Sequence, residues 1–181
     1  MILVFRRTGQ RRYAVEAQRA GFPDLEMNPA PGYDPLMPHD MMHLVVEAQL
    51  GLTRGIFGQL ASGGDAGTFH LFATRGESSR AIARVRNRVK ARGRKLLKGG
   101  RDECAQSERA THVCWNEWLA RSSSHEVRDT GVTKLPTLNQ RKLDDICKHL
   151  DQLSAQWSRL KVGQSMAVAW PGLAIVSEAN T

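Results

Sequence analysis

Residues 38–47 carry the side chains of this 181-residue chain that are best suited to chemistry. The segment reads Pro38-His39-Asp40-Met41-Met42-His43-Leu44-Val45-Val46-Glu47. On a helix with about 100° per residue, its four ionisable side chains share one quadrant, and apolar side chains fill most of the remaining surface. Two histidines four residues apart can converge on one divalent ion, and a carboxylate one turn further on can add an oxygen ligand. The pattern therefore predicts a divalent metal, with zinc as the leading candidate, bound by His39, His43 and Glu47.

Asp40 is the candidate catalytic residue of this segment. Its carboxylate can orient an imidazole ring, accept a proton from metal-bound water, or stabilise the first helical turn. Two other interpretations stay open: a metal-free acid–base pair, and an ordinary amphipathic helix whose polar stripe contains two histidines. A metal would also need a ligand from elsewhere in the chain, and the candidates are His70, His112, His125 and His149.

Short motifs here resemble those of known families. His39-Asp40-x-x-His43 resembles the HExxH motif of zinc proteases, with Asp in place of Glu, and the HDxxH motif of a zinc-associated ubiquinone-biosynthesis scaffold family. The pair His39-Asp40 is also shared with the HD phosphohydrolases. More broadly, PHDxxHxxVE and GxxxGxFGxLAxGG over residues 38–64, with a closing VGxSMxxxWP, are similar to an uncharacterised bacterial family. The local resemblances imply metal binding through these residues, and the broad one implies a bacterial, cytoplasmic protein without supplying an activity.

Positive charge is the second chemical feature, and it is concentrated in one segment. The chain has 26 Lys plus Arg against 18 Asp plus Glu, a net charge of +8, and residues 75–101 hold eleven of the bases and one acid. Such a segment attracts anions, so an alternative hypothesis is a module that binds nucleic acid or another polyanion through residues 80–98. A solvated helix face and contact with a membrane surface are the other interpretations. The proposed anion-binding residues are Arg80, Arg84, Arg86, Arg88, Lys90, Arg94 and Lys95.

Other patterns exclude classes of function. Gly58 and Gly63 have the spacing of a phosphate-binding loop, but Gly64-Asp65 stands where Lys-Ser/Thr is required. No segment approaches the roughly 20 apolar residues of a membrane-spanning helix, and the first residues do not have the pattern of a secretory signal. The three cysteines lack CxxC spacing and favour a reducing cytoplasm.

Hydrophobic periodicity predicts an α+β fold. Strands at 2–6 and 12–17 form a hairpin, and a C-terminal strand at 165–170 joins them in a small antiparallel sheet. The proline-rich stretch 21–38 predicts an ordered crossing loop. Five helices are expected at 38–50, 54–61, 78–97, 102–120 and 137–160. Gly99-Gly100 would end the third helix, and Thr137 with Gln140 would cap the fifth.

These elements predict one α+β domain over residues 1–171 and a loose tail over 172–181. The regular apolar stripe of helix 138–160 allows a homodimer. The preferred hypothesis is a cytoplasmic metal-binding protein with no membrane partner, and a hydrolase or lyase acting through metal-activated water if it is an enzyme. The alternatives are the nucleic-acid or polyanion-binding module and a structural accessory protein.

Overall fold

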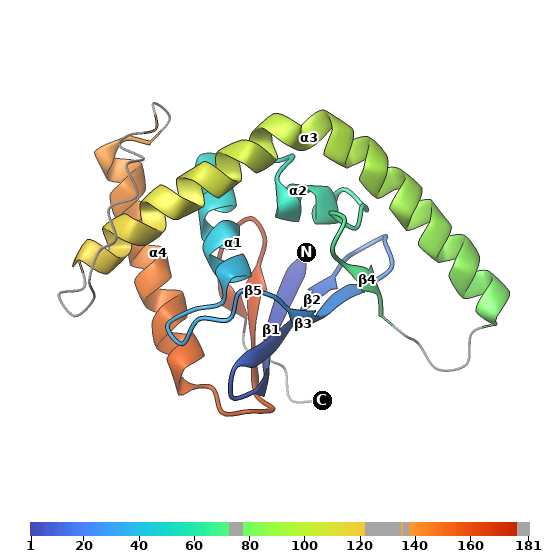
Figure 1. Cartoon of the computed structure of the whole chain (residues 1–181), viewed down its shortest axis with the longest axis horizontal. Coiled ribbons are helices and arrows are strands. Elements are labelled where there is room, and N and C mark those ends of the chain that lie inside the picture. The colour runs from blue at the N-terminus through green and yellow to red at the C-terminus, as the bar shows by residue number, and fades with distance from the viewer. Residues whose placement is uncertain (73–77, 122–134, 136–137, 177–181) are drawn as a thin grey trace.

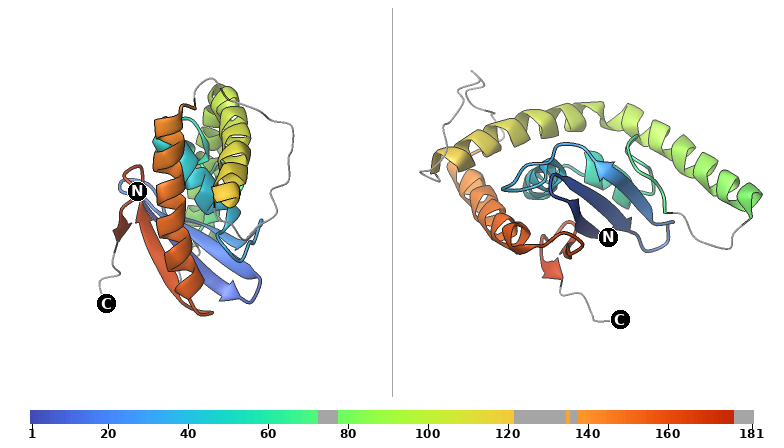
Figure 2. Two further views of the ribbon diagram at one scale, coloured as in Figure 1. Left: turned by 90° about the vertical axis from the view of Figure 1, so that its left-hand side faces the viewer. Right: turned by 60° about the horizontal axis from the view of Figure 1, so that its bottom comes forward.

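The computed structural model describes residues 1–72, 78–121, 135 and 138–176. Within them lie an open antiparallel sheet of six strands, in the order β4-β3-β2-β1-β5-β6, and four helices that pack over it (Figures 1 and 2). This arrangement confirms the α+β prediction. The strands are β1 Ile2–Gly9, β2 Arg12–Gln18, β3 Leu25–Ala30, β4 His70–Leu71, β5 Ser165–Ala169 and β6 Ile175–Val176. The helices are α1 His39–Leu50, α2 Ile56–Ala61, α3 Ser79–Arg121 and α4 Gln140–Arg159.

The centre of the sheet is the predicted hairpin with the predicted C-terminal strand beside it. β1 pairs antiparallel with β2 on one side and with β5 on the other, so that Phe5 lies opposite both Val15 and Met166. These three side chains lie on one face of the sheet because residues directly opposite one another on neighbouring strands point the same way. All three are buried in the core beneath the helices.

The proline-rich stretch contains a strand, and the prediction of a crossing loop over 21–38 was wrong for its middle. Residues 25–30 form β3, which pairs with β2 and, through Leu25 and Glu26 alone, with β4. Pro29 lies beyond the pairing with β4 and at a break in the register with β2, between Tyr13 and Val15. The missing N–H of the proline therefore interrupts no regular ladder there.

The two helices predicted at 78–97 and 102–120 are one continuous helix of 43 residues, α3. Gly99-Gly100 does not end it. A Cβ at Gly100 would overlap the backbone carbonyl oxygen of Arg54, and a Cβ at Gly93 would overlap the carboxylate of Asp65. Both glycines are buried where a loop approaches the helix closely, so tertiary contact explains them better than a helix stop.

The start of the last helix and the C-terminal tail also differ from the prediction. Helix α4 begins after Asn139, whose side chain accepts a hydrogen bond from the backbone N–H of Lys142 at 2.9 Å, and Gln140 bonds to Asp144 instead of capping. Thr137, the other half of the predicted cap, lies outside the described residues. In the predicted tail, residues 175–176 form β6 and pair with β5, while 177–181 lie outside the described residues.

Helix α1 lies in the middle of the core, between the sheet and the two long helices, and contacts both α3 and α4. Its predicted bounds are confirmed, and it ends at Gly51 in the left-handed conformation. The apolar stripe of α4, including Ile146, Leu150 and Trp157, is buried in the same core. That stripe is therefore already covered within one chain, which removes the reason for expecting a homodimer through residues 138–160. No helix in the described part of the chain is both long and apolar enough to span a membrane.

Candidate metal site

The two histidines of α1 meet a carboxylate from α3. Nε2 of His43 lies 3.0 Å from Nε2 of His39, and 3.6 Å from Oε2 of Glu108. The two rings meet edge to face, with centroids 4.7 Å apart. Among the described residues, His39, His43 and Glu108 form the group whose ligand atoms all lie within 4.8 Å of one another.

These separations are close to those of a metal site. Two ligand atoms bound to one zinc ion at about 2.0–2.1 Å, in tetrahedral geometry, lie about 3.3 Å apart. The observed distances of 3.0 and 3.6 Å differ from this by a few tenths of an ångström. His39 and Glu108 are both exposed, so small side-chain rotations can adjust both distances, whereas His43 is buried.

A buried hydrogen-bonded chain determines which nitrogen of His43 faces the cluster. The Ser107 hydroxyl donates to Oε1 of Glu47 at 2.9 Å, and the Ser107 oxygen lies 2.8 Å from Nδ1 of His43. When Glu47 is ionised, the hydroxyl gives its hydrogen to the carboxylate. The hydroxyl oxygen then accepts from His43, which places the proton of His43 on Nδ1. Oγ1 of Thr111 lies 3.3 Å from the same nitrogen. The lone pair of His43 is therefore on Nε2, directed at His39 and Glu108.

Glu47, predicted as a ligand, supports the site from behind instead of joining the cluster. It is fully buried, and its two oxygens accept from the backbone N–H groups of Ile56 and Phe57, at 2.9 and 3.0 Å, as well as from Ser107. The N–H groups at the start of a helix carry partial positive charge, so Glu47 caps α2. A Cβ at Gly55 would overlap this carboxylate, which explains the glycine at that position.

Burial shifts the pKa values of His43 and Glu47, the two ionisable groups of this hydrogen-bonded chain, in opposite directions. It lowers the pKa of His43 to about 4, with a smaller contribution from His39. It raises the pKa of Glu47 to about 7, although the three donors act in the opposite direction. His43 is therefore neutral at physiological pH, and a neutral imidazole is the form that binds metals.

Asp40, the predicted catalytic residue, lies against the sheet. The Tyr13 hydroxyl donates to its carboxylate and also contacts the carbonyl oxygen of Pro31. Burial raises the pKa of Asp40, while the hydrogen bond from Tyr13 and the nearby His39 act to lower it. Asp40 is outside the group of clustered ligand atoms, and its contacts fasten the first turn of α1 to β2.

The other histidines considered as metal ligands lie at different distances from the cluster, and one of them lines the pocket beside it. His112 lies on α3 one turn after Glu108, and its ring lines the same pocket as His39. His70 is exposed on the edge strand β4, and His149 on α4 contacts Gln49 at 3.3 Å. His125 lies outside the described residues.

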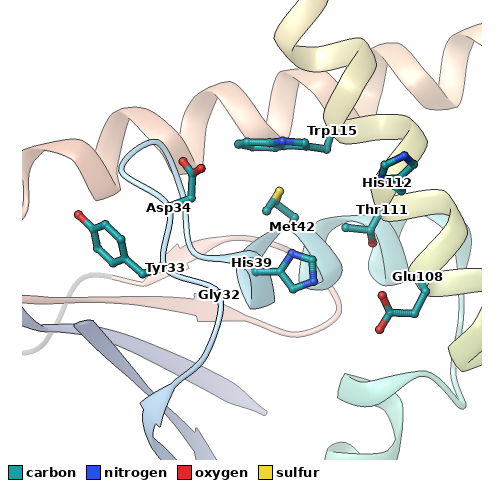
Figure 3. Close-up of a pocket in the computed structure, with 9 residues that line it drawn as sticks. All are labelled: Gly32, Tyr33, Asp34, His39, Met42, Glu108, Thr111, His112 and Trp115. Carbon is teal, nitrogen blue, oxygen red and sulfur yellow. The ribbon is translucent and has the colours of Figure 1, made fainter. Parts of the chain in front are cut away.

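A pocket of about 320 Å³ opens beside the cluster (Figure 3). One wall is the loop from β3 to α1, the second is the start of α1, and the third is formed by successive turns of α3. Apolar surface from Met42 and Trp115 faces polar groups that include Asp34 and His112. The lining residues are Gly32, Tyr33, Asp34, His39, Met42, Glu108, Thr111, His112 and Trp115.

The predicted anion-binding residues lie elsewhere, on the other half of α3. All seven are exposed: Arg80, Arg84, Arg86, Arg88, Lys90, Arg94 and Lys95. The cluster and the pocket use residues 108–115 of the same helix, so the two features are separate surfaces joined by one element.

The sequence interpretation missed Ser107 and Glu108. Ser107 is 64 positions from the histidine that it contacts, and no local periodicity connects such distant residues. The spacing Glu108-x-x-x-His112 was the available signal, because residues four apart share a helix face. Recognising it required knowing that α3 continues through Gly99-Gly100 and crosses α1.

Comparison with family models, with curated proteins and with solved structures gives no match.

Proposed function

We propose that this chain binds one divalent metal ion through Nε2 of His39, Nε2 of His43 and the carboxylate of Glu108. The observation that carries the proposal is the buried chain from Glu47 through Ser107 to His43, which holds the proton on Nδ1 and presents the Nε2 lone pair to the cluster. Metal-binding histidines are commonly held in this way by a carboxylate or hydroxyl on the other ring nitrogen.

The ligand types favour zinc and a reactive site. Two imidazoles and one carboxylate leave a fourth tetrahedral position free, which is the usual composition of a catalytic zinc centre, whereas structural zinc sites use four protein ligands. A metal in such a site lowers the pKa of a bound water and polarises a substrate oxygen. The proposed activity is hydrolysis or a related lyase reaction on a small molecule.

The pocket supports a small substrate. Its volume of about 320 Å³ lies at the lower end of the range for small-molecule sites. Trp115 and Met42 offer apolar surface to the body of a ligand, while His112 and Asp34 can hold polar groups. His112 is close enough along α3 to contact a substrate that reaches Glu108.

Metal titration tests the proposal directly. Purified protein is stripped with a chelator and titrated with Co²⁺, whose absorption spectrum reports coordination number, and Zn²⁺ affinity is measured by competition. We expect one equivalent bound in four-coordinate geometry. His43→Ala and Glu108→Gln should each lose the site, while His70→Ala, which removes an exposed histidine on β4, should bind normally.

Two results would refute the metal site. One is binding of less than about a tenth of an equivalent by the wild-type chain. The other is equal metal binding by His43→Ala and His70→Ala. Circular dichroism of each variant separates loss of a ligand from loss of the fold.

A further inference from the structure

The outward face of the first half of α3 carries ten basic residues and no acid. Between Ser79 and Arg101 the helix holds Arg80, Arg84, Arg86, Arg88, Lys90, Arg92, Arg94, Lys95, Lys98 and Arg101, and all ten are exposed. We call this surface the basic face. At about 100° per residue the ten side chains spread over about 240° of the helix circumference.

The remaining arc of the same helix faces the protein. Val89, Gly93 and Gly100 are buried, and Leu96 packs close to Gly64. The basic face is therefore held in a fixed orientation toward solvent by contacts on the opposite side. Figure 1 shows this half of α3 extending past β4 at the edge of the sheet.

The basic face is not neutralised by the described part of the protein. No ion pair within the described residues involves any of the ten bases. Two arginines outside the basic face do have partners. Arg121 forms ion pairs with Glu117 and Asp144, and the buried Arg19 donates hydrogen bonds to backbone carbonyls. The guanidinium of Arg92 lies 4.9 Å from the centre of the Phe22 ring.

We infer that the basic face binds double-stranded nucleic acid through its phosphate backbone. Twenty-three helical residues extend for about 35 Å, which is about one turn of a duplex. A duplex carries one negative charge per roughly 1.7 Å of its axis. The bases of the basic face that are turned toward the duplex can therefore contact phosphates along its length. The binding is independent of base sequence, because arginine and lysine contacts to phosphate carry no sequence information.

The composition and packing of the helix favour a duplex over other polyanions. Residues 79–101 contain no aromatic residue, and sites for single strands depend on aromatic side chains that stack on bases. Val89 is buried on the opposite side of the helix, and Leu97 is the large hydrophobic side chain exposed among residues 79–101, so the helix lacks the broad apolar face that enters a membrane surface. This surface lies away from His39 and Glu108, so binding of a duplex does not depend on the proposed metal site.

Fluorescence anisotropy with a labelled mixed-sequence duplex of 20 base pairs tests the inference. The probe is titrated with the full chain at several NaCl concentrations upward from about 50 mM. We expect micromolar or tighter binding at the lowest salt, and a log–log slope against salt of about −5 or steeper if six or more phosphates are contacted. The test variant is the triple substitution Arg84→Gln, Arg88→Gln, Lys95→Gln.

A matched control removes the same charge elsewhere. Arg141→Gln, Lys148→Gln, Arg159→Gln also neutralises two arginines and one lysine, all exposed on α4. The test variant should bind at least about tenfold more weakly, with a slope shallower by about 2–3 units, while the control stays near wild type. A third variant, Arg84→Lys, Arg88→Lys, Lys95→Arg, keeps the charge and should keep the affinity, which shows that the loss is electrostatic.

Three outcomes would overturn the inference. The first is no binding to the duplex at about 50 mM salt. The second is an equal loss of affinity in the test and control variants, because net charge alone would then explain the binding. The third is binding of single-stranded DNA, polyglutamate or phosphatidylserine vesicles as tightly as the duplex, because the partner would then be another class of anion.

Discussion

Ser107 connects Glu47 to His43, and replacing it with alanine isolates this connection. The substitution removes a hydroxyl that donates to a carboxylate at 2.9 Å and accepts from an imidazole at 2.8 Å. Both bonds are buried, because Ser107 is fully buried and His43 nearly so. A net value of about 1 kcal/mol for the bond to the imidazole and about 1.5–3 kcal/mol for the bond to the carboxylate gives a loss of roughly 2.5–4 kcal/mol in the free energy of unfolding. The higher helix propensity of alanine returns about 0.5 kcal/mol.

The expected effect on the metal is separate from the effect on stability. Without Ser107, the proton of His43 is no longer confined to Nδ1, and a fraction of the rings present N–H instead of a lone pair to the metal. Loss of such a supporting group typically weakens metal affinity about 10–100-fold, or about 1.4–2.7 kcal/mol. Thr111, 3.3 Å from Nδ1, can replace part of the contact. The double variant Ser107→Ala, Thr111→Val should therefore bind more weakly than the sum of the two single effects predicts.

Zn²⁺ affinity by chelator competition and unfolding by urea measure the two effects on the same samples. Ser158→Ala is the control, since it makes the same change on an exposed face of α4. Zn²⁺ affinity within twofold of wild type in both Ser107→Ala and the double variant would refute the tautomer argument, even if both proteins were less stable. The hydrogen-bonded chain would then serve packing alone.

Three further predictions concern the fold. Gly99→Ala should raise the free energy of unfolding by about 0.5–1 kcal/mol, because nothing lies within 4 Å of the added Cβ. Gly100→Ala should lower it by about 1–3 kcal/mol, because the added Cβ would overlap the Arg54 carbonyl. Urea unfolding of the two variants measures both changes. Asn139→Ala should lower the unfolding free energy by about 1 kcal/mol by removing the cap of α4, as thermal unfolding will show. Burial raises the pKa of Cys114 to about 12, so the thiol stays protonated in the folded state while the unfolded chain ionises above pH 9. Stability should fall as pH rises, by about 1.4 kcal/mol from this group at pH 10, and a Cys114→Ala variant with an unchanged pH profile would contradict this.

The predicted elements succeeded where a pattern is local. The hairpin, α1 with its stop at Gly51, and the strand at 165–169 follow from alternation, helical spacing and a left-handed glycine, which neighbouring residues alone determine. The prediction was wrong at Gly100 and at Pro29 for one reason. Glycine and proline have several uses, and the neighbouring segment decides which applies: a close loop allows a helix to continue through glycine, and an irregular register admits proline into a strand.

The candidate site shows the same division. The sequence alone determined that His39 and His43 share one helix face, because four residues make about one turn. It also determined that the excess positive charge belongs to one helical segment, residues 75–101. Only the tertiary structure decided that Glu108 completes the cluster, that Glu47 lies behind His43 with Ser107 between them, and that ten bases face solvent without described partners. Those facts depend on where α3 crosses α1 and on which side of α3 is buried, and long-range packing of a shared core sets both.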